Sequence, residues 1–118
     1  MADGTTLPPQ VQQQLSNLQA LNANYQATAQ QRAQFEGMRM ESQSALAALE
    51  SLPDDATVYR NVGALLVRDE KKAAVERLKE DLETSEVRIT RLQKQEATLR
   101  EQLQTLQERI QAALQGKA

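Results

Sequence analysis

The chain has 118 residues, of which 40% are apolar and 25% charged, but only 3% are aromatic, and it contains no Cys, His or Trp. Because Cys and His supply the usual structural zinc sites and catalytic nucleophile–base couples, the composition excludes both, and it excludes disulfides as well. The formal net charge of −2 provides no general attraction to nucleic acid or to an anionic membrane. One Phe and two Tyr cannot anchor a deep core. The Ala, Leu and Gln content is typical of long helices and coiled coils.

No export signal or membrane segment is expected. Residues 1–9 have neither a basic n-region nor an apolar h-region, so they do not resemble a signal peptide, and we expect them to be flexible. No apolar run approaches the roughly 20 residues that span a bilayer. Together with the absence of Cys, these features favour a reducing, cytoplasmic location and no membrane partner.

Residues 10–52 have the spacing of a first long helix, since apolar side chains recur every three, four or seven positions without an intervening proline. A proline pair precedes this segment and Pro53 follows it, as expected at helix boundaries. A heptad frame through Leu18 must slip by one residue to include Met38, so we expect a local change of winding near Gly37. The frame before the slip contains Leu15, Leu18, Asn22, Tyr25, Ala29 and Arg32, and the frame after it contains Phe35 and Met38.

Residues 53–68 have a different composition, with β-branched and aromatic side chains in two short runs. The turn-forming segment Asn61-Val62-Gly63 separates the runs, which predicts a β-hairpin. An isolated hairpin is only marginally stable and leaves unpaired backbone groups at its edges, so we expect it to pair with other subunits. The alternative, that it only closes the helical pair, leaves these edges unsatisfied. The residues predicted to mediate oligomerisation are Val58, Val62, Leu65 and Val67, with Tyr59 and Leu66 on the other face.

Residues 69–115 have the stricter pattern of a second helix, with apolar a and d positions sustained for about six heptads. Asp69 is the predicted N-cap and Gly116 the predicted glycine after the helix end. Two polar positions, Ser85 and Glu96, interrupt the seam and could specify its register. The a positions are Val75, Leu82, Ile89, Glu96, Leu103 and Ile110, and the d positions are Leu78, Ser85, Leu92, Leu99, Leu106 and Ala113.

The combined prediction is a single, mainly α domain spanning residues 1–118. It consists of a long antiparallel two-helix coiled coil joined by a β-hairpin that oligomerises into a β-barrel body. Counting outward from the hairpin places Leu49 near Val75 and Met38 near Ser85. Two helices bury only one stripe each, so the core is thin for its length and favours assembly with other subunits.

Nearly the whole chain resembles the prefoldin β subunits of archaeal type, most strongly in the hairpin. Residues 54–67 are similar to that family's D-x-x-V-Y-K-x-V-G-x-L-hydrophobic-V segment, with Arg60 where Lys is common, and the similarity continues through residues 83–89. The resemblance implies a hexamer of two α and four β subunits with a double β-barrel body. It also implies an ATP-independent holdase chaperone that captures unfolded polypeptides at coiled-coil tips and transfers them to a group II chaperonin. The chain has no G-x-x-x-x-G-K-[ST] motif, which agrees with the absence of a nucleotide cofactor.

The tips of the coiled coil are the predicted client-binding site. Leu21 and Leu114 fall outside the predicted seam, so they are the better candidates for exposed apolar contact. Taken one at a time, Leu15, Leu18, Leu103, Leu106 and Ile110 are better explained as seam residues, although a frayed helix end could serve both roles. The predicted client-binding residues are Val11, Leu15, Leu18, Leu21, Leu103, Leu106, Ile110 and Leu114.

Other functional classes explain the sequence less well. A structural or filament-forming coiled-coil protein without client transfer accounts for the heptads, but a purely structural coil gives no reason for a hairpin with unpaired edges. An enzyme is not expected, because no nucleophile, base and orienting residue converge, and no metal site is predicted. A basic-region DNA-binding protein requires a block of Lys and Arg before the heptads, whereas residues 69–74 are mixed in sign.

Overall fold

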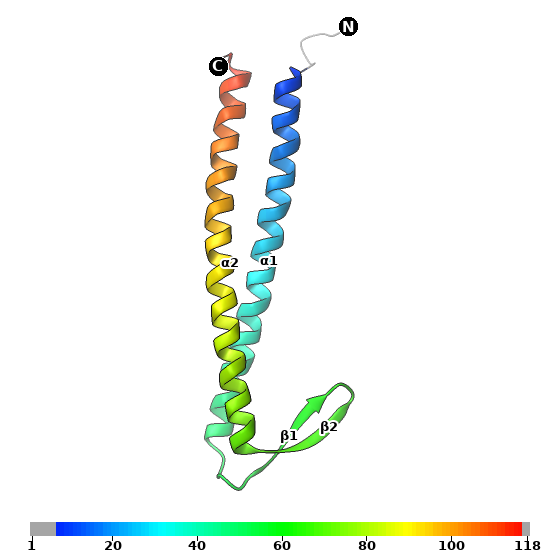
Figure 1. The fold of residues 1–118 in the computed structure, drawn as a ribbon, viewed down its shortest axis with the longest axis vertical. Helices are drawn as coiled ribbons and strands as arrows, with labels where there is room; N and C mark the ends of the chain where they lie inside the picture. Colours follow the sequence, from blue (N-terminus) through cyan, green and yellow to red (C-terminus); the bar gives the residue numbers. More distant parts are fainter. Residues whose placement is uncertain (1–6, 117–118) are drawn as a thin grey trace. The chain divides into compact units, whose positions relative to one another are not determined.

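The computed structural model describes residues 7–116, so the first six residues of the predicted flexible segment 1–9 lie outside the described part of the chain. Two helices flank a pair of strands in the described residues (Figure 1). Among these residues, neither helix is both long and apolar enough to cross a membrane. The element order is α1 (Pro9–Glu50), β1 (Thr57–Val62), β2 (Leu65–Glu70) and α2 (Lys71–Leu114).

The chain divides into two compact units, and each contains part of both helices. The terminal unit comprises Met1–Gln31 and Leu92–Ala118, and the hairpin unit comprises Arg32–Arg91. Within each unit the α1 and α2 segments run antiparallel (Figure 1). This arrangement confirms the predicted mainly α fold of two long antiparallel helices joined by a β-hairpin. The β-barrel stays a prediction.

Helix α1 begins and ends where its prolines allow. Pro9 is the first helical residue, a position where its missing N–H costs little. At the other end, Leu52 N–H donates to the Leu49 carbonyl at 3.1 Å, the tighter bonding that commonly closes a helix. Because Leu52 precedes Pro53, helical dihedrals are disfavoured for it. The helix therefore ends at Glu50 rather than at the predicted residue 52.

The least exposed side chains of α1 follow an uninterrupted alternation of three and four residues, so the predicted slip near Gly37 is wrong. Asn22 and Met38, both assigned to the seam from the sequence, are exposed. Polar residues occupy several seam positions, and arginine can cover a seam with its aliphatic stem. A search for apolar residues alone therefore misplaced the frame. The observed seam consists of Val11, Gln14, Leu18, Leu21, Tyr25, Thr28, Arg32, Phe35, Arg39, Ser42, Leu46 and Leu49.

The seam of α2 is confirmed at every predicted a and d position, all of which are buried or half-buried. The polar residues Ser85 and Glu96 are buried as deeply as Ile89 and Leu92. Gly116, just after the end of α2, has a φ of +74°. This confirms the predicted role of Gly116 as the glycine that ends the helix, because glycine adopts a left-handed backbone conformation most easily.

Among the described residues, an arginine–aromatic contact joins the two helices in each unit. In the hairpin unit, Arg88 of α2 lies over the ring of Phe35, with its guanidinium carbon 5.3 Å from the ring centroid. In the terminal unit, Arg100 lies over Tyr25 at 5.9 Å. Contacts of this kind stabilise exposed sites by about 0.5–1 kcal/mol, so they add to the apolar seam without replacing it.

The strands form a two-stranded antiparallel hairpin in which Val62 pairs with Leu65. Only Gly63 and Ala64 lie between these two residues, and Gly63 has a φ of +60°. A two-residue turn with glycine in the left-handed region at its first position corresponds to the type II′ turn, whose twist matches that of the flanking strands. The predicted turn at Asn61-Val62-Gly63 is therefore placed too early, because Asn61 and Val62 belong to β1.

Candidate functional site

The hairpin has one face that is mainly apolar, because side chains alternate between the faces of a strand. The register pairs Val62 with Leu65 and Arg60 with Val67. These pairings place four apolar residues predicted to mediate oligomerisation on the same face, and Tyr59 and Leu66 on the opposite one. We call the first set the apolar hairpin face: Val58, Val62, Leu65 and Val67.

Most of this apolar surface is exposed. Leu65 is 67% exposed, and on the opposite face Tyr59 and Leu66 are 64% and 69% exposed, whereas Val58 is half-buried. The sheet contains two strands, so each strand has one edge without a neighbouring strand among residues 7–116. Exposed apolar groups and open strand edges on the same element are typical of an interaction surface.

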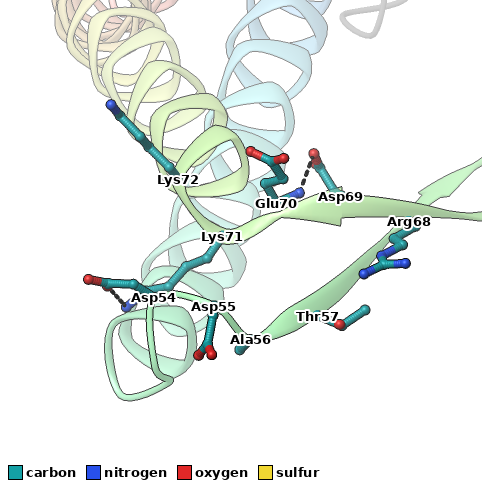
Figure 2. A pocket seen from close by; sticks show the side chains of 9 residues that line it. All are labelled: Asp54, Asp55, Ala56, Thr57, Arg68, Asp69, Glu70, Lys71 and Lys72. Atoms are coloured by element: carbon teal, nitrogen blue, oxygen red, sulfur yellow. Dashed lines mark hydrogen bonds and ion pairs between the residues drawn. The ribbon is translucent and has the colours of Figure 1, made fainter.

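The base of the hairpin joins directly to α2, because β2 ends at Glu70 and α2 begins at Lys71. Lys71 Nζ donates to the Leu52 carbonyl at 2.6 Å and lies 3.3 Å from Asp54 Oδ1. A cation is favourable at the carboxyl end of a helix, where backbone carbonyls lack partners. Figure 2 shows the Lys71 side chain extending toward Asp54. Lys71 thereby tethers the segment that leads into the hairpin to the start of α2.

Asp69, at the end of β2, makes the corresponding contact on the other side of the junction. Its Oδ2 accepts a hydrogen bond from Arg77 Nη1 at 2.7 Å, and its Oδ1 accepts one from the Glu70 N–H at 2.9 Å. These two bonds lower the pKa of the Asp69 carboxyl, and the bond from Arg77 has the larger effect. The positive charge of Arg60 lowers the pKa further. The prediction that Asp69 caps α2 is wrong, since it lies within β2 and binds the N–H of Glu70, which precedes the helix.

A recess of about 610 Å³ lies at this junction, and charged side chains of both signs line most of it (Figure 2). Four carboxylates and three cations are present, so the recess carries no strong net field. Among residues 7–116, no three potential ligands of the His, Cys, Asp and Glu types are grouped to hold a metal ion. The lining residues are Asp54, Asp55, Ala56, Thr57, Arg68, Asp69, Glu70, Lys71 and Lys72.

The predicted client-binding residues all lie in the terminal unit, but few of them are exposed. Val11 and Ile110 are buried, with 2% and 6% of their surface accessible, whereas Leu114 is 55% exposed. The prediction that Leu21 lies off the seam is wrong, because it is half-buried in the seam of α1. The other candidates are half-buried: Leu15, Leu18, Leu103 and Leu106.

Two of these candidates meet in a recess of about 430 Å³ within the terminal unit. Leu21 of α1 and Leu106 of α2 supply its apolar lining, and Glu101 and Arg109 add charge of both signs. The sequence prediction missed the polar lining, because these residues occupy ordinary solvent-facing positions of the heptad. No spacing rule singles them out, and only the packing of α1 against α2 brings them next to Leu21.

The chain matches known proteins over nearly its whole length. Residues 12–117 match the family model described as "Prefoldin subunit". Prefoldin subunit beta of Methanosarcina acetivorans is 46% identical over 95% of this chain and 96% of its own length, and that of Thermococcus kodakarensis is 44% identical over 92% of each. The crystal structure of the prefoldin beta subunit from Thermococcus strain KS-1 superposes with a TM-score of 0.82 at 44% identity, covering 92% of this chain and 96% of that one. The chain therefore belongs to the prefoldin subunit family, which consists of chaperones, and its relatives are the beta subunits.

Proposed function

We propose that this chain is the beta-type subunit of a hetero-oligomeric, ATP-independent holdase chaperone. The observation that carries the proposal is the hairpin, whose apolar face and open strand edges are exposed in the single chain. In the proposed hexamer of two alpha and four beta subunits, hairpins of neighbouring subunits cover these groups in a shared β-barrel. The names of the relatives, which are beta subunits, support a second, alpha-type partner.

The client-binding site of this proposal is the terminal unit. An unfolded polypeptide can reach two apolar features there: the exposed side chain of Leu114, and the recess that Leu21 and Leu106 line. One such site binds weakly, but several subunits acting on one client raise the overall affinity by a factor of about 10² or more. The captured client is then transferred to a group II chaperonin. No step of this activity requires a catalytic residue or a cofactor.

Two measurements test the proposal. A chemically denatured client is diluted into the chain mixed with an alpha-type partner, and aggregation is followed by turbidity; we expect suppression without ATP. The mass of the complex is then compared for the wild type and Leu65→Asp, which places a charge on the apolar hairpin face. Since burial of an unpaired carboxylate is strongly unfavourable, we expect a smaller assembly. An unchanged mass would refute assembly through this face.

The second candidate is a structural or filament-forming assembly protein without client transfer. It is favoured by the same exposed hairpin, because open strand edges promote association whatever the function. The two candidates differ in the turbidity assay, where a purely structural protein leaves client aggregation unchanged. They also differ in mass, because a filament grows from this chain alone whereas the proposed hexamer closes with a partner.

A further inference from the structure

Two cations in the first two turns of α2 hold the two ends of the hairpin. Lys71 binds the incoming chain at the Leu52 carbonyl, and Arg77 binds the outgoing strand at Asp69. The Lys71 contact depends mainly on the carbonyl at 2.6 Å, because the Asp54 side chain is fully exposed and a pair of that kind contributes little.

The Arg77–Asp69 pair spans the point where strand becomes helix. The Asp69 carboxylate is 15% exposed and receives a second hydrogen bond from Glu70 N–H, so its position is constrained from two directions. No loop separates β2 from α2, and a rotation at Glu70–Lys71 changes the direction of the whole hairpin. A charge-assisted bond of 2.7 Å between residues eight positions apart opposes that rotation.

We infer that Arg77 is a positioning residue that, through its bond to Asp69, holds the hairpin at one angle to α2 and so preorganises the apolar hairpin face for assembly. This inference rests on the proposed assembly through the hairpin. Fixing a binding element in its bound orientation before association removes part of the ordering cost of binding. The effect therefore falls on assembly rather than on the folding of the helix pair, whose seams do not include Arg77.

The chain contains no Cys, so two introduced thiols can be labelled without background. Ala64→Cys lies in the hairpin turn and Thr84→Cys on the exposed surface of α2. We expect the distance distribution between spin labels at these positions to be narrow in the otherwise wild-type chain and broad in Arg77→Gln. Labelled chain is diluted into unlabelled chain, so that only distances within one molecule contribute.

Arg91→Gln is the matched control, because Arg91 is an exposed residue at the same heptad position two heptads further along α2. It should leave the distance distribution and the assembly unchanged. Exchange of the charges, Asp69→Arg with Arg77→Asp, should restore part of the narrow distribution. Helix content by circular dichroism should be equal in all variants, which separates positioning from folding.

Assembly with an alpha-type partner, measured by sedimentation, should weaken by up to about fivefold in Arg77→Gln, the factor expected for loss of one partly exposed ion pair. A distribution as narrow as that of the wild type, or unchanged assembly, would overturn the inference. Failure of the proposed assembly through the hairpin would look different. In that case Leu65→Asp would leave the mass of the complex unchanged, whatever the distances between the spin labels.

Discussion

The guanidinium of Arg100 in α2 lies over the ring of Tyr25 in α1, and its Nη2 also donates a hydrogen bond of 3.3 Å to the tyrosine hydroxyl. These residues are 75 positions apart in the chain, so the contact belongs to one register of the terminal unit. A shift by one heptad would separate them by about 10 Å. The pair therefore contributes to the choice of register as well as to stability.

The first prediction concerns this pair. A double-mutant cycle of Tyr25→Leu, which removes the ring and the hydroxyl together, and Arg100→Gln should give a coupling free energy of unfolding of about 0.5–1 kcal/mol, measured by urea unfolding. The cycle is needed because Arg100 makes a further interaction, so its single substitution removes more than the contact with Tyr25. A coupling energy of zero would show that the ring and the guanidinium act independently.

The second prediction compares two aliphatic residues of α2 that lie two positions apart. Ile89 is 3% exposed and Val87 is 54% exposed. Ile89→Ala should lower the free energy of unfolding by about 2 kcal/mol or more, because it leaves a cavity in the seam. Val87→Ala should change it by less than about 0.5 kcal/mol. Equal effects would contradict the assigned seam.

The third prediction concerns client binding by Leu114. Leu114→Ser should weaken the suppression of client aggregation without lowering the thermal midpoint, because this side chain is 55% exposed. Val87→Ser is the control, since its side chain is similarly exposed, at 54%, but lies in the hairpin unit. Leu21→Ser should reduce both suppression and stability, because Leu21 is a seam residue. If suppression survived both leucine substitutions, the terminal unit would not be the client site.

The fourth prediction concerns pH. The bond from Arg77, the Glu70 N–H and the charge of Arg60 together hold the pKa of Asp69 below its usual value of about 3.9. A lowered pKa in the folded state means that the stabilisation is present above the unfolded pKa and is lost as the pH falls through the folded value. The stability difference between the wild type and Asp69→Asn should be constant from about pH 7 to pH 5 and shrink below about pH 4.

Unfolding of these two proteins by urea at each pH measures that difference, and other carboxylates cancel because both chains contain them. A difference that stayed constant down to about pH 2 would show that the Asp69 carboxylate contributes nothing specific. One that changed near pH 7 would assign the titration to another group.

The two helices differ in how well they could be predicted. The α2 seam is almost wholly apolar, so periodicity located every position, including the buried Ser85 and Glu96 between apolar neighbours. The α1 seam also contains Arg39 and three short or amide polar residues that the predicted frame missed, because periodicity of apolar residues does not detect them. The predicted frame was therefore displaced by one residue at alternate positions, as at Leu15 and Met38, whereas Leu18 and Tyr25 were placed correctly. Burial of a long polar side chain depends on the partner helix, which the local sequence does not describe.

Much of the hairpin could be predicted, because alternation along the first strand assigns Val58 and Val62 to one face and Tyr59 to the other. Its turn was placed too early, since Gly63 alone provides the left-handed conformation and the residues before it continue the strand. The contacts at its base could not be predicted. Arg77 and Asp69 are eight residues apart across a change of secondary structure, and no helical or strand period brings such positions together.

By itself the sequence determined that this protein is built from long amphipathic helices, that a hairpin joins them and that it contains no thiol or imidazole side chain, because these follow from composition and local periodicity. Only the tertiary structure decided which polar side chains enter the α1 seam, which apolar candidates stay exposed and which cations hold the hairpin. These features depend on burial and charge pairing between residues that are distant in the chain, and such residues meet only once the helices have packed.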